Sequence, residues 1–290
     1  MSILPLLLVI SAAFIHATWN LLAKRAAPAG AAFVFAYNVV ASVAYLPWVA
    51  WLLVTREQVW NWPIVFCFIA SAIIHLGYSL CLQRGYQAAD LSVVYPIARG
   101  TGPLLSSIGA FVLLNEPPTL PGVLGLVAVV AGIGFISTQG NLAAFRQPKG
   151  QEGVRWGLAT GSLIAAYTVV DGYGVKVLGI HPVLLDWFSN FLRLFLLGPL
   201  MLKNPARTMK AMKGYWWLAI GVGLFSPLSY ILVLTAVDIG APLSLVAPAR
   251  EMSMMVGAIF GMLILREPVN IWRVAGCATI IVGVLMLGAA

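Results

Sequence analysis

Charged residues are scarce in this sequence. Lys, Arg, Asp and Glu account for 9% of the 290 residues, whereas about 25% is usual for a soluble globular domain. Hydrophobic residues account for 61%. So few charges exclude an ordinary water-soluble protein, because apolar side chains would have to cover most of its surface. The composition therefore indicates an integral membrane protein.

Recognisable catalytic and cofactor motifs are also missing. The chain contains no HExxH or other metal-ligand spacing and no glycine-rich loop for nucleotide phosphates. No nucleophile and base stand at a useful spacing. The three cysteines, Cys67, Cys81 and Cys277, fall within apolar segments and indicate packing residues, not a disulfide framework. We expect no enzyme activity, no metal and no cofactor.

Among the few charges, basic residues are in excess, with 17 Lys and Arg against 9 Asp and Glu. In a soluble protein this balance would suggest a nucleic-acid partner. Here the basic residues stand between apolar segments, which is the pattern of loops retained in the cytoplasm by the positive-inside rule. We therefore expect the lipid bilayer as a partner and no nucleic acid.

Ten apolar segments are each long enough to cross a bilayer, which takes about 20 residues in a helix. Their approximate bounds are 3–23, 31–54, 62–83, 92–114, 119–138, 154–175, 182–202, 214–236, 242–265 and 271–289. The connections are short, and none has room for a soluble domain. The segments lack the alternation of barrel strands, so the expected fold is an all-α integral membrane protein with ten transmembrane helices.

The basic residues also predict an orientation. Those that flank the odd-numbered connections are Lys24, Arg25, Arg84, Arg146, Lys149, Arg155, Lys203, Arg207, Lys210, Lys213, Arg266 and Arg273. The even-numbered connections offer little beyond Arg56 and Lys176. Positive-inside therefore puts the odd-numbered connections in the cytoplasm and both termini outside.

The two halves of the chain resemble each other. Residues that recur 151 positions later are Arg99, Glu116, Pro117, Gly125 and Gly132, matched by Arg250, Glu267, Pro268, Gly276 and Gly283. Matches at slightly different offsets join Lys24, Asn38, Pro47 and Asp90 to Lys176, Asn190, Pro199 and Asp238. Each half has five helices, an odd number, so the copies must cross the membrane in opposite senses, as in secondary transporters with inverted repeats. The first repeat is expected at 1–140, a cytoplasmic connection at 141–153 and the second repeat at 154–290.

Two stretches connect this pattern to a known family. DLSVVYPIARGTGPLL at residues 90–105, before a Glu-Pro helix end, and its weaker echo in the second half resemble the EamA-type transporters of the drug/metabolite transporter superfamily. HATWNLLAKR at residues 16–25 is similar to a subgroup associated with phosphonate utilisation. The resemblance implies a multi-pass carrier of the bacterial inner membrane with two inverted repeats and a central cavity. Many members of the family export amino acids or related metabolites.

The resemblance also bears on the class of solute. Small multidrug transporters of the same superfamily bind cations with a glutamate in the first span. This chain has His16 and Asn20 in the corresponding region. The difference argues against a role in the transport of cationic drugs.

Arg99 and Arg250 are the strongest candidates for a binding site, because an arginine inside a membrane is costly. Both lie about 9–12 Å from their helix ends at 1.5 Å per residue, and inversion would bring them to one cavity from opposite sides. A guanidinium suits a carboxylate, phosphonate or phosphate. The alternative is an internal ion pair or a side chain that snorkels to the interface.

The segment around Arg99 also contains Pro96, Gly100, Gly102 and Pro103. Prolines remove helix hydrogen bonds and glycines permit unwinding, which predicts a broken helix that lines the cavity. A kinked but continuous helix with small residues for packing is the alternative.

Carboxylates inside apolar segments must face the interior, find a partner or take up a proton. Asp171 and Glu251 are therefore the candidates for proton coupling, and otherwise each neutralises an arginine. His75 is the other titratable group at depth, although a lone histidine in a helix more often packs. Glu116 and Glu267 precede prolines at helix ends, and we expect them to be interfacial and exposed to water.

The other predicted binding residues are polar or aromatic. Asp186, Asn190 and Arg193 share a helix face, on which Asn190 or a substrate could bridge the two charges; a structural network between helices is the alternative. Trp19 and the tyrosines would form cavity walls or pack between helices. The full set predicted for substrate binding is Arg99, Arg250, Trp19, Asn20, His75, Tyr78, Tyr95, Asn190, Arg193 and Tyr230.

Together these features predict a secondary active transporter. Its substrate would be a small anionic or zwitterionic metabolite, such as an amino acid or a phosphonate, moved outward by alternating access and coupled to protons. The alternative is a broad exporter of hydrophobic or cationic compounds, in which binding would depend on Asp171 and Glu251 and not on the arginines. The expected partners are the small solute and the bilayer, and the sequence is compatible with a monomer.

Overall fold

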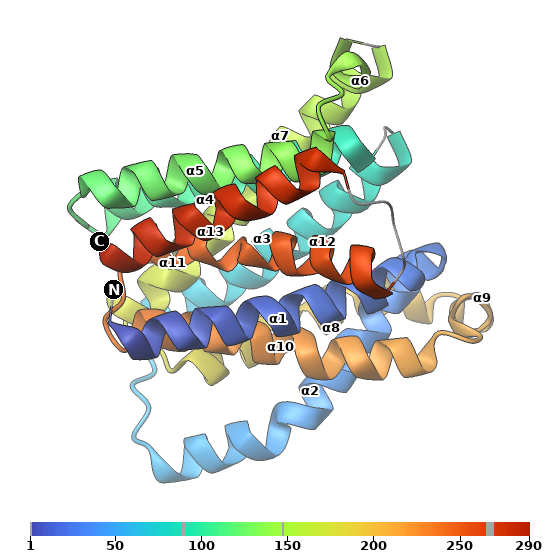
Figure 1. The fold of residues 1–290 in the computed structure, drawn as a ribbon. Coiled ribbons are helices and arrows are strands. Elements are labelled where there is room, and N and C mark those ends of the chain that lie inside the picture. Colours follow the sequence, from blue (N-terminus) through green and yellow to red (C-terminus); the bar gives the residue numbers. More distant parts are fainter. Residues whose placement is uncertain (1, 89–90, 147, 265–269) are drawn as a thin grey trace.

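The computed structural model describes residues 2–88, 91–146, 148–264 and 270–290, and within these ranges the chain is helical and contains no strand (Figure 1). Asp90, Glu267 and Pro268, which entered the comparison of the two halves, lie outside the described residues, as does Arg266, which entered the prediction of orientation. The helices of the first half are α1 (Ile3–Arg25), the short 3-10 helix η1 (Ala27–Ala29), α2 (Gly30–Thr55), α3 (Trp62–Ala88), α4 (Leu91–Leu113) and α5 (Leu120–Thr138). Those that follow are α6 (Ala143–Arg146), α7 (Pro148–Lys176), α8 (Pro182–Leu202), α9 (Pro205–Met212), α10 (Trp216–Asp238), α11 (Leu243–Arg250), α12 (Met252–Ile264) and α13 (Ile271–Ala289).

Every predicted apolar segment coincides with a helix, or in one case with the pair α11 and α12. Among the described residues, eight segments are long and apolar enough to cross a membrane by their length and composition. The predicted segments 92–114 and 154–175, which form α4 and most of α7, are not among the eight. Each of these two helices carries a charged residue within its apolar part, Arg99 in α4 and Asp171 in α7.

The predicted interruption occurs in the other half of the chain. Helix α4 is continuous from Leu91 to Leu113 with Pro96 and Pro103 inside it, so the expectation of a broken helix there is wrong. The second copy is interrupted instead, because α11 ends at Arg250 and α12 begins at Met252. Glu251 stands between them, and its backbone N–H bonds to the Pro248 carbonyl, three residues back. A helical proline lacks a donor and disturbs the turn around it.

The outer faces of the helices are apolar. Large hydrophobic side chains such as Val54, Leu120 and Leu285 are 86%, 73% and 67% exposed. Arg99, Arg250, Asp171 and Glu251, in contrast, are buried. Water would favour the opposite distribution, whereas lipid tails accept an apolar surface and drive charged groups to the interior of a bundle.

The two termini lie at the same end of the bundle, and the short helices α6 and α9 lie at the other end (Figure 1). Helices α6 and α9 belong to the long connections 139–153 and 203–213, which are rich in basic residues. The connections that the positive-inside rule assigns to the cytoplasm therefore lie opposite the termini.

Helices α5 and α13 pack against each other through four glycines (Figure 1). A Cβ built on Gly125 would come within 2.8 Å of the Gly283 carbonyl oxygen, and one built on Gly132 within 2.8 Å of the Gly276 carbonyl oxygen. The pairing runs in opposite directions along the two helices, so they are antiparallel. The contacts are also reciprocal, because a Cβ on Gly276 would approach the Gly132 carbonyl oxygen to 2.8 Å. Backbones approach this closely in membranes where small residues permit it.

This contact gives a first prediction. Gly132→Ala is expected to destabilise the protein by about 1–3 kcal/mol, because the added methyl group meets backbone atoms of α13 that cannot move aside. Gly134→Ala is the matched control on the same helix, since a Cβ there would meet nothing within 4 Å. Thermal unfolding in detergent measures both variants. Equal melting temperatures for the two would contradict the packing described here.

Glu116 was expected to be interfacial and exposed to water, and this prediction is wrong. Its side chain is 7% exposed, not open to water. The carboxylate accepts hydrogen bonds from the backbone N–H groups of Leu243, at 2.7 Å, and Ser244, at 2.8 Å, and from the Lys176 ammonium, at 2.7 Å. It thus caps the first turn of α11, where unpaired N–H groups carry partial positive charge.

These contacts decide the ionisation of Glu116, which lies in the connection between α4 and α5. Burial alone would raise its pKa, but the hydrogen bonds from Lys176, Ser244 and Leu243 outweigh burial and hold the pKa below its usual value. The charged Glu116 side chain therefore bonds the α4–α5 connection to the end of α7 and to the start of α11.

Candidate functional site

Arg99 of α4 meets residues from both ends of the chain. Its guanidinium donates to the Glu251 carboxylate, with Nη1 3.2 Å from Oε2, and lies 2.9 Å from Nε2 of His16 on α1. A guanidinium can only donate, so Nε2 of His16 must be the acceptor. The Tyr95 ring lies 5.4 Å from the Arg99 guanidinium carbon, within reach of a cation–π contact.

Arg250 approaches the same carboxylate. Its Nη2 atom lies 3.5 Å from Oε1 of Glu251, the next residue in the chain. Adjacent residues of a regular helix do not face each other, but Glu251 stands where α11 ends and α12 has yet to begin. Both arginines therefore contact one buried carboxylate, and this internal ion pair is the alternative that the sequence left open beside a binding role.

Asp171 forms a second group, without an arginine. Its Oδ2 atom lies 3.0 Å from Nε2 of His75 on α3 and accepts a hydrogen bond from the Tyr230 hydroxyl on α10. Asp171 is fully buried in α7. Of the two carboxylates predicted for proton coupling, Glu251 thus contacts arginines, whereas Asp171 contacts a histidine and a tyrosine.

Aromatic rings line the second group. The His75 ring stacks on Tyr167 with centroids 3.9 Å apart, and Tyr230 stands edge-on to both. Tyr78 lies edge-on to Tyr167 at 5.6 Å. Tyr78 and Tyr230 were predicted site residues, and Tyr167 completes the group between them.

Two further predicted residues lie beside the first group. The indole N–H of Trp19 donates to the Ser229 hydroxyl at 3.2 Å, and the Trp19 ring is edge-on to His16 at 4.8 Å. Asn20 donates to the His16 backbone carbonyl at 3.0 Å, within its own helix. Trp19 therefore connects α1 to α10 next to Arg99, whereas Asn20 bonds to its own turn.

Asn190 and Arg193 belong to a separate network on α8. The Asn190 amide donates to the Asp186 carboxylate at 2.8 Å and accepts from the Arg193 guanidinium at 2.6 Å. Ser189 of the same helix lies 3.1 Å from Ser71 of α3, hydroxyl to hydroxyl. The predicted bridge through Asn190 is present, and these contacts of the triad lie within α8 itself.

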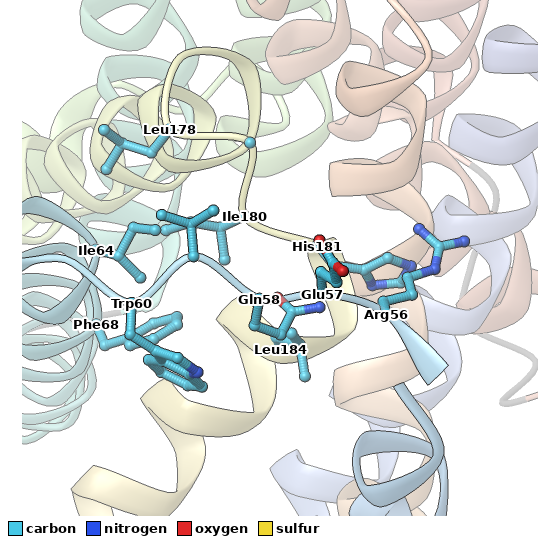
Figure 2. A pocket seen from close by; sticks show the side chains of 12 residues that line it. Arg56, Glu57, Gln58, Trp60, Ile64, Phe68, Leu178, Ile180, His181 and Leu184 are labelled. Atoms are coloured by element: carbon cyan, nitrogen blue, oxygen red, sulfur yellow. The ribbon is translucent and has the colours of Figure 1, made fainter. Parts of the chain in front are cut away.

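A pocket of about 190 Å³ lies elsewhere, between the α2–α3 connection and the α7–α8 connection (Figure 2). Trp60, Phe68, Ile180 and His181 are among the side chains that surround it. His181 caps α8 by accepting from the Val183 N–H, and burial together with Arg56 lowers its pKa. None of the predicted site residues lines this pocket, and its volume is below the roughly 300–1,000 Å³ typical of small-molecule sites.

His16 and Tyr167 enter the polar groups although neither was among the predicted binding residues. His16 had a signal, since the resemblance placed it, with Asn20, in the region where small multidrug transporters carry a glutamate. Tyr167 stands four residues before Asp171, which places it one turn away on the same helix face. The partners of both residues come from helices distant in sequence.

Apolar helices that enclose two buried polar groups define a multi-pass membrane protein. The chain belongs to the EamA-like transporter family, whose sequence profile matches residues 3–138 and 151–289. The resemblance seen in the sequence is thereby confirmed, and the family is one of transporters.

Individual relatives are more distant. Over 74 residues the chain is 38% identical to the multidrug resistance protein EbrB of Bacillus atrophaeus and 36% identical to EbrB of Bacillus subtilis (strain 168). These matches cover 25% of this chain and 58% of each relative. A solved crystal structure superposes with a TM-score of 0.70 over 97% of this chain and 95% of its own, at 16% identity. That likeness bears on the fold alone.

Proposed function

We propose that this protein is a secondary active transporter of a small anionic or zwitterionic metabolite, with ten transmembrane helices arranged as two inverted repeats. The reciprocal antiparallel contact of α5 and α13 supports the repeats, since residues 151 positions apart exchange roles in it. The two stretches matched by the family profile, 3–138 and 151–289, support repeats at 1–140 and 154–290.

The single observation that carries the choice of an anion is the charge of the Arg99 group. Arg99 and Arg250 are both buried, and Glu251 is the carboxylate that both contact. Two positive charges and one negative charge leave the group with one uncompensated positive charge. A buried charge without a partner is costly, so an incoming carboxylate or phosphonate would stabilise the group.

The arginines would then exchange partners during transport. In the structure Glu251 contacts both guanidinium groups, and the group is closed off from solvent. A solute anion would take the place of Glu251 at one of the arginines, in a bidentate contact that a guanidinium makes well.

Proton coupling is assigned to Asp171. Glu251 contacts the guanidinium groups of Arg99 and Arg250. Asp171 contacts the His75 ring and accepts a hydrogen bond from the Tyr230 hydroxyl. A carboxylate with such partners can take up and release a proton when its access to water alternates.

We propose the bacterial inner membrane as the location, with α6 and α9 in the cytoplasm and both termini outside, because basic connections are retained inside. We propose export as the direction and a monomer as the functional unit, without enzyme activity or a cofactor. We propose Asn190 and Arg193 of α8 as further contacts for the solute, with a structural role as the alternative.

Flux into proteoliposomes tests the function. Radiolabelled amino acids and phosphonates are expected to enter vesicles that contain the protein, and a pH gradient is expected to change the rate. Empty vesicles provide the background. Absence of flux for every anionic and zwitterionic solute would refute the anion site.

A broad exporter of hydrophobic or cationic compounds is the second candidate. The similarity to two proteins named for multidrug resistance favours it, although it extends over 74 residues. In that case resistance of overexpressing cells would require Asp171 and Glu251 and would persist without Arg99 and Arg250. Growth in a panel of toxic compounds separates the two candidates.

A further inference from the structure

The connection between α8 and α10, which contains α9, carries positive charge without a nearby carboxylate. Its basic residues, all exposed, are Lys203, Arg207, Lys210 and Lys213. Within the described part of the chain, none of these four residues makes an ion pair. No acidic residue occurs in the sequence between Asp186 and Asp238, and α2 and η1, which pack against α9, contain none. An anion that balances this α9 basic group therefore has to come from outside the chain.

Helix α9 is docked on the bundle. Met212 is fully buried and belongs to an apolar cluster with residues of α2, α8 and α10. The Thr208 hydroxyl donates to the Met201 carbonyl of α8 at 3.0 Å. Thr208 and Met212 are four residues apart and mark the docked face of α9, whereas Arg207 and Lys210 are three apart and exposed. The basic side chains are thus presented by a helix that tertiary contacts hold in place.

The α9 basic group lies where the apolar surface of the bundle ends. On the side of α8, the exposed residues Leu200 and Leu202 come directly before Lys203. On the side of α10, the helix begins with the exposed Trp216 and Trp217. Exposed leucines suit lipid tails, and tryptophans are typical of the membrane–water interface. The cations between these two boundaries are therefore expected at the depth of the lipid headgroups.

The basic residues at the start of α7 differ from this group. Lys149 and Arg155 are also exposed. Glu152 stands three residues from each of them, so a carboxylate lies beside both on the surface of the helix. The positive-inside rule counts the two connections alike, but a local carboxylate is available to the cations of α7 and not to those of α9.

We propose that the α9 basic group binds the headgroup phosphate of an anionic phospholipid at the edge of the bilayer. A phosphodiester without an ammonium of its own, as in phosphatidylglycerol, supplies the negative charge that the group lacks. The Arg207 guanidinium can contact two of its oxygens, and the lysines act as point charges. Phosphatidylcholine has the same phosphate but carries its own cation. The site takes no part in the transport step, so the inference is independent of the proposed function.

Two phospholipids with the same acyl chains test the inference. The purified, full-length protein is titrated in detergent with dioleoyl-phosphatidylglycerol or dioleoyl-phosphatidylcholine, and native mass spectrometry gives the apparent dissociation constant of the first bound lipid. The wild-type protein is expected to bind phosphatidylglycerol about 10-fold more tightly, because several basic residues act on one uncompensated charge. A rise in salt from about 50 mM to about 500 mM should reduce this advantage, since the Debye length falls.

Paired variants locate the site. Arg207→Gln combined with Lys210→Gln removes two charges from the exposed face of α9 and is expected to reduce the advantage of phosphatidylglycerol to about 3-fold or less. Lys149→Gln combined with Arg155→Gln removes the same charge from α7 and should keep the advantage. Arg207→Lys combined with Lys210→Arg preserves the charge of α9 and should keep it as well.

Every outcome decides the question. Equal affinity of the wild-type protein for the two lipids would overturn the proposed site. An equal loss of the advantage in the α9 and α7 glutamine variants would also overturn it, because net charge and not α9 would then attract the lipid. If the α9 glutamine variant does not fold, the wild-type comparison, the α7 variant and the charge-preserving variant remain as tests.

Discussion

Arg99→Gln is expected to reduce solute flux about 100-fold or more. Glutamine cannot present the charged fork that binds a carboxylate, and it removes contacts to Glu251, His16 and Tyr95 together. Glu251 keeps Arg250 as its ion partner in this variant, so the expected loss of stability is smaller than the loss of about 3–5 kcal/mol that is typical when a buried charge loses its partner. Flux in proteoliposomes and thermal unfolding in detergent measure the two effects separately.

A double variant distinguishes a binding role from a structural one. Arg99→Gln combined with Glu251→Gln also removes the carboxylate that Arg99 contacts, and flux should stay low, because the fork that binds the anion is still missing. Arg207→Gln is the control, because Arg207 is exposed on α9. Flux near the wild-type level in the double variant would reduce Arg99 to a structural residue.

The second large effect is expected at Glu116. Glu116→Ala should lower stability by about 2–4 kcal/mol, because it leaves the N–H groups of Leu243 and Ser244 without their acceptor and Lys176 without its ion partner. Glu152→Ala is the matched control, since Glu152 is an exposed carboxylate near the start of α7. Thermal unfolding of both variants in one detergent gives the comparison.

The pH dependence of this contribution has a definite sign. The contacts hold the pKa of Glu116 below its usual value, so they stabilise the fold fully above the unfolded pKa of about 4.3. The contribution is lost as the pH falls through the lower pKa of the folded state. The wild-type protein should therefore lose stability in acid more steeply than Glu116→Ala. If the stability of the two proteins fell in parallel as the pH is lowered, the contacts of Glu116 would not contribute as described.

Much of the fold could be predicted from local sequence. A helix that crosses a bilayer must be long and apolar, and this requirement alone located the ends of α8 and α13 to the residue. The interruption of the ninth segment was not predictable in this way. Proline and glycine are more frequent around Arg99 than around Arg250. Helix α4 is nevertheless continuous, and the helical segment that contains Arg250 is interrupted at Glu251.

The buried charged residues could be singled out from the sequence, but the residues that contact them could not. Arg99, Arg250, Asp171 and Glu251 stand out because charge is costly in an apolar segment. Their partners depend on tertiary packing, since Arg99 and Glu251 are 152 residues apart and His75 and Asp171 are 96 apart. Glu116 was assigned to the interface for the same reason, because its partners are in α7 and α11.

The most direct test of the central claim is an experimental structure with the transported solute bound. The account predicts that the anionic group of the solute lies within hydrogen-bond distance of Arg99 or Arg250 and that Glu251 has moved away from that guanidinium. A solute whose anionic group lies elsewhere, with Glu251 still in contact with both arginines, would contradict it.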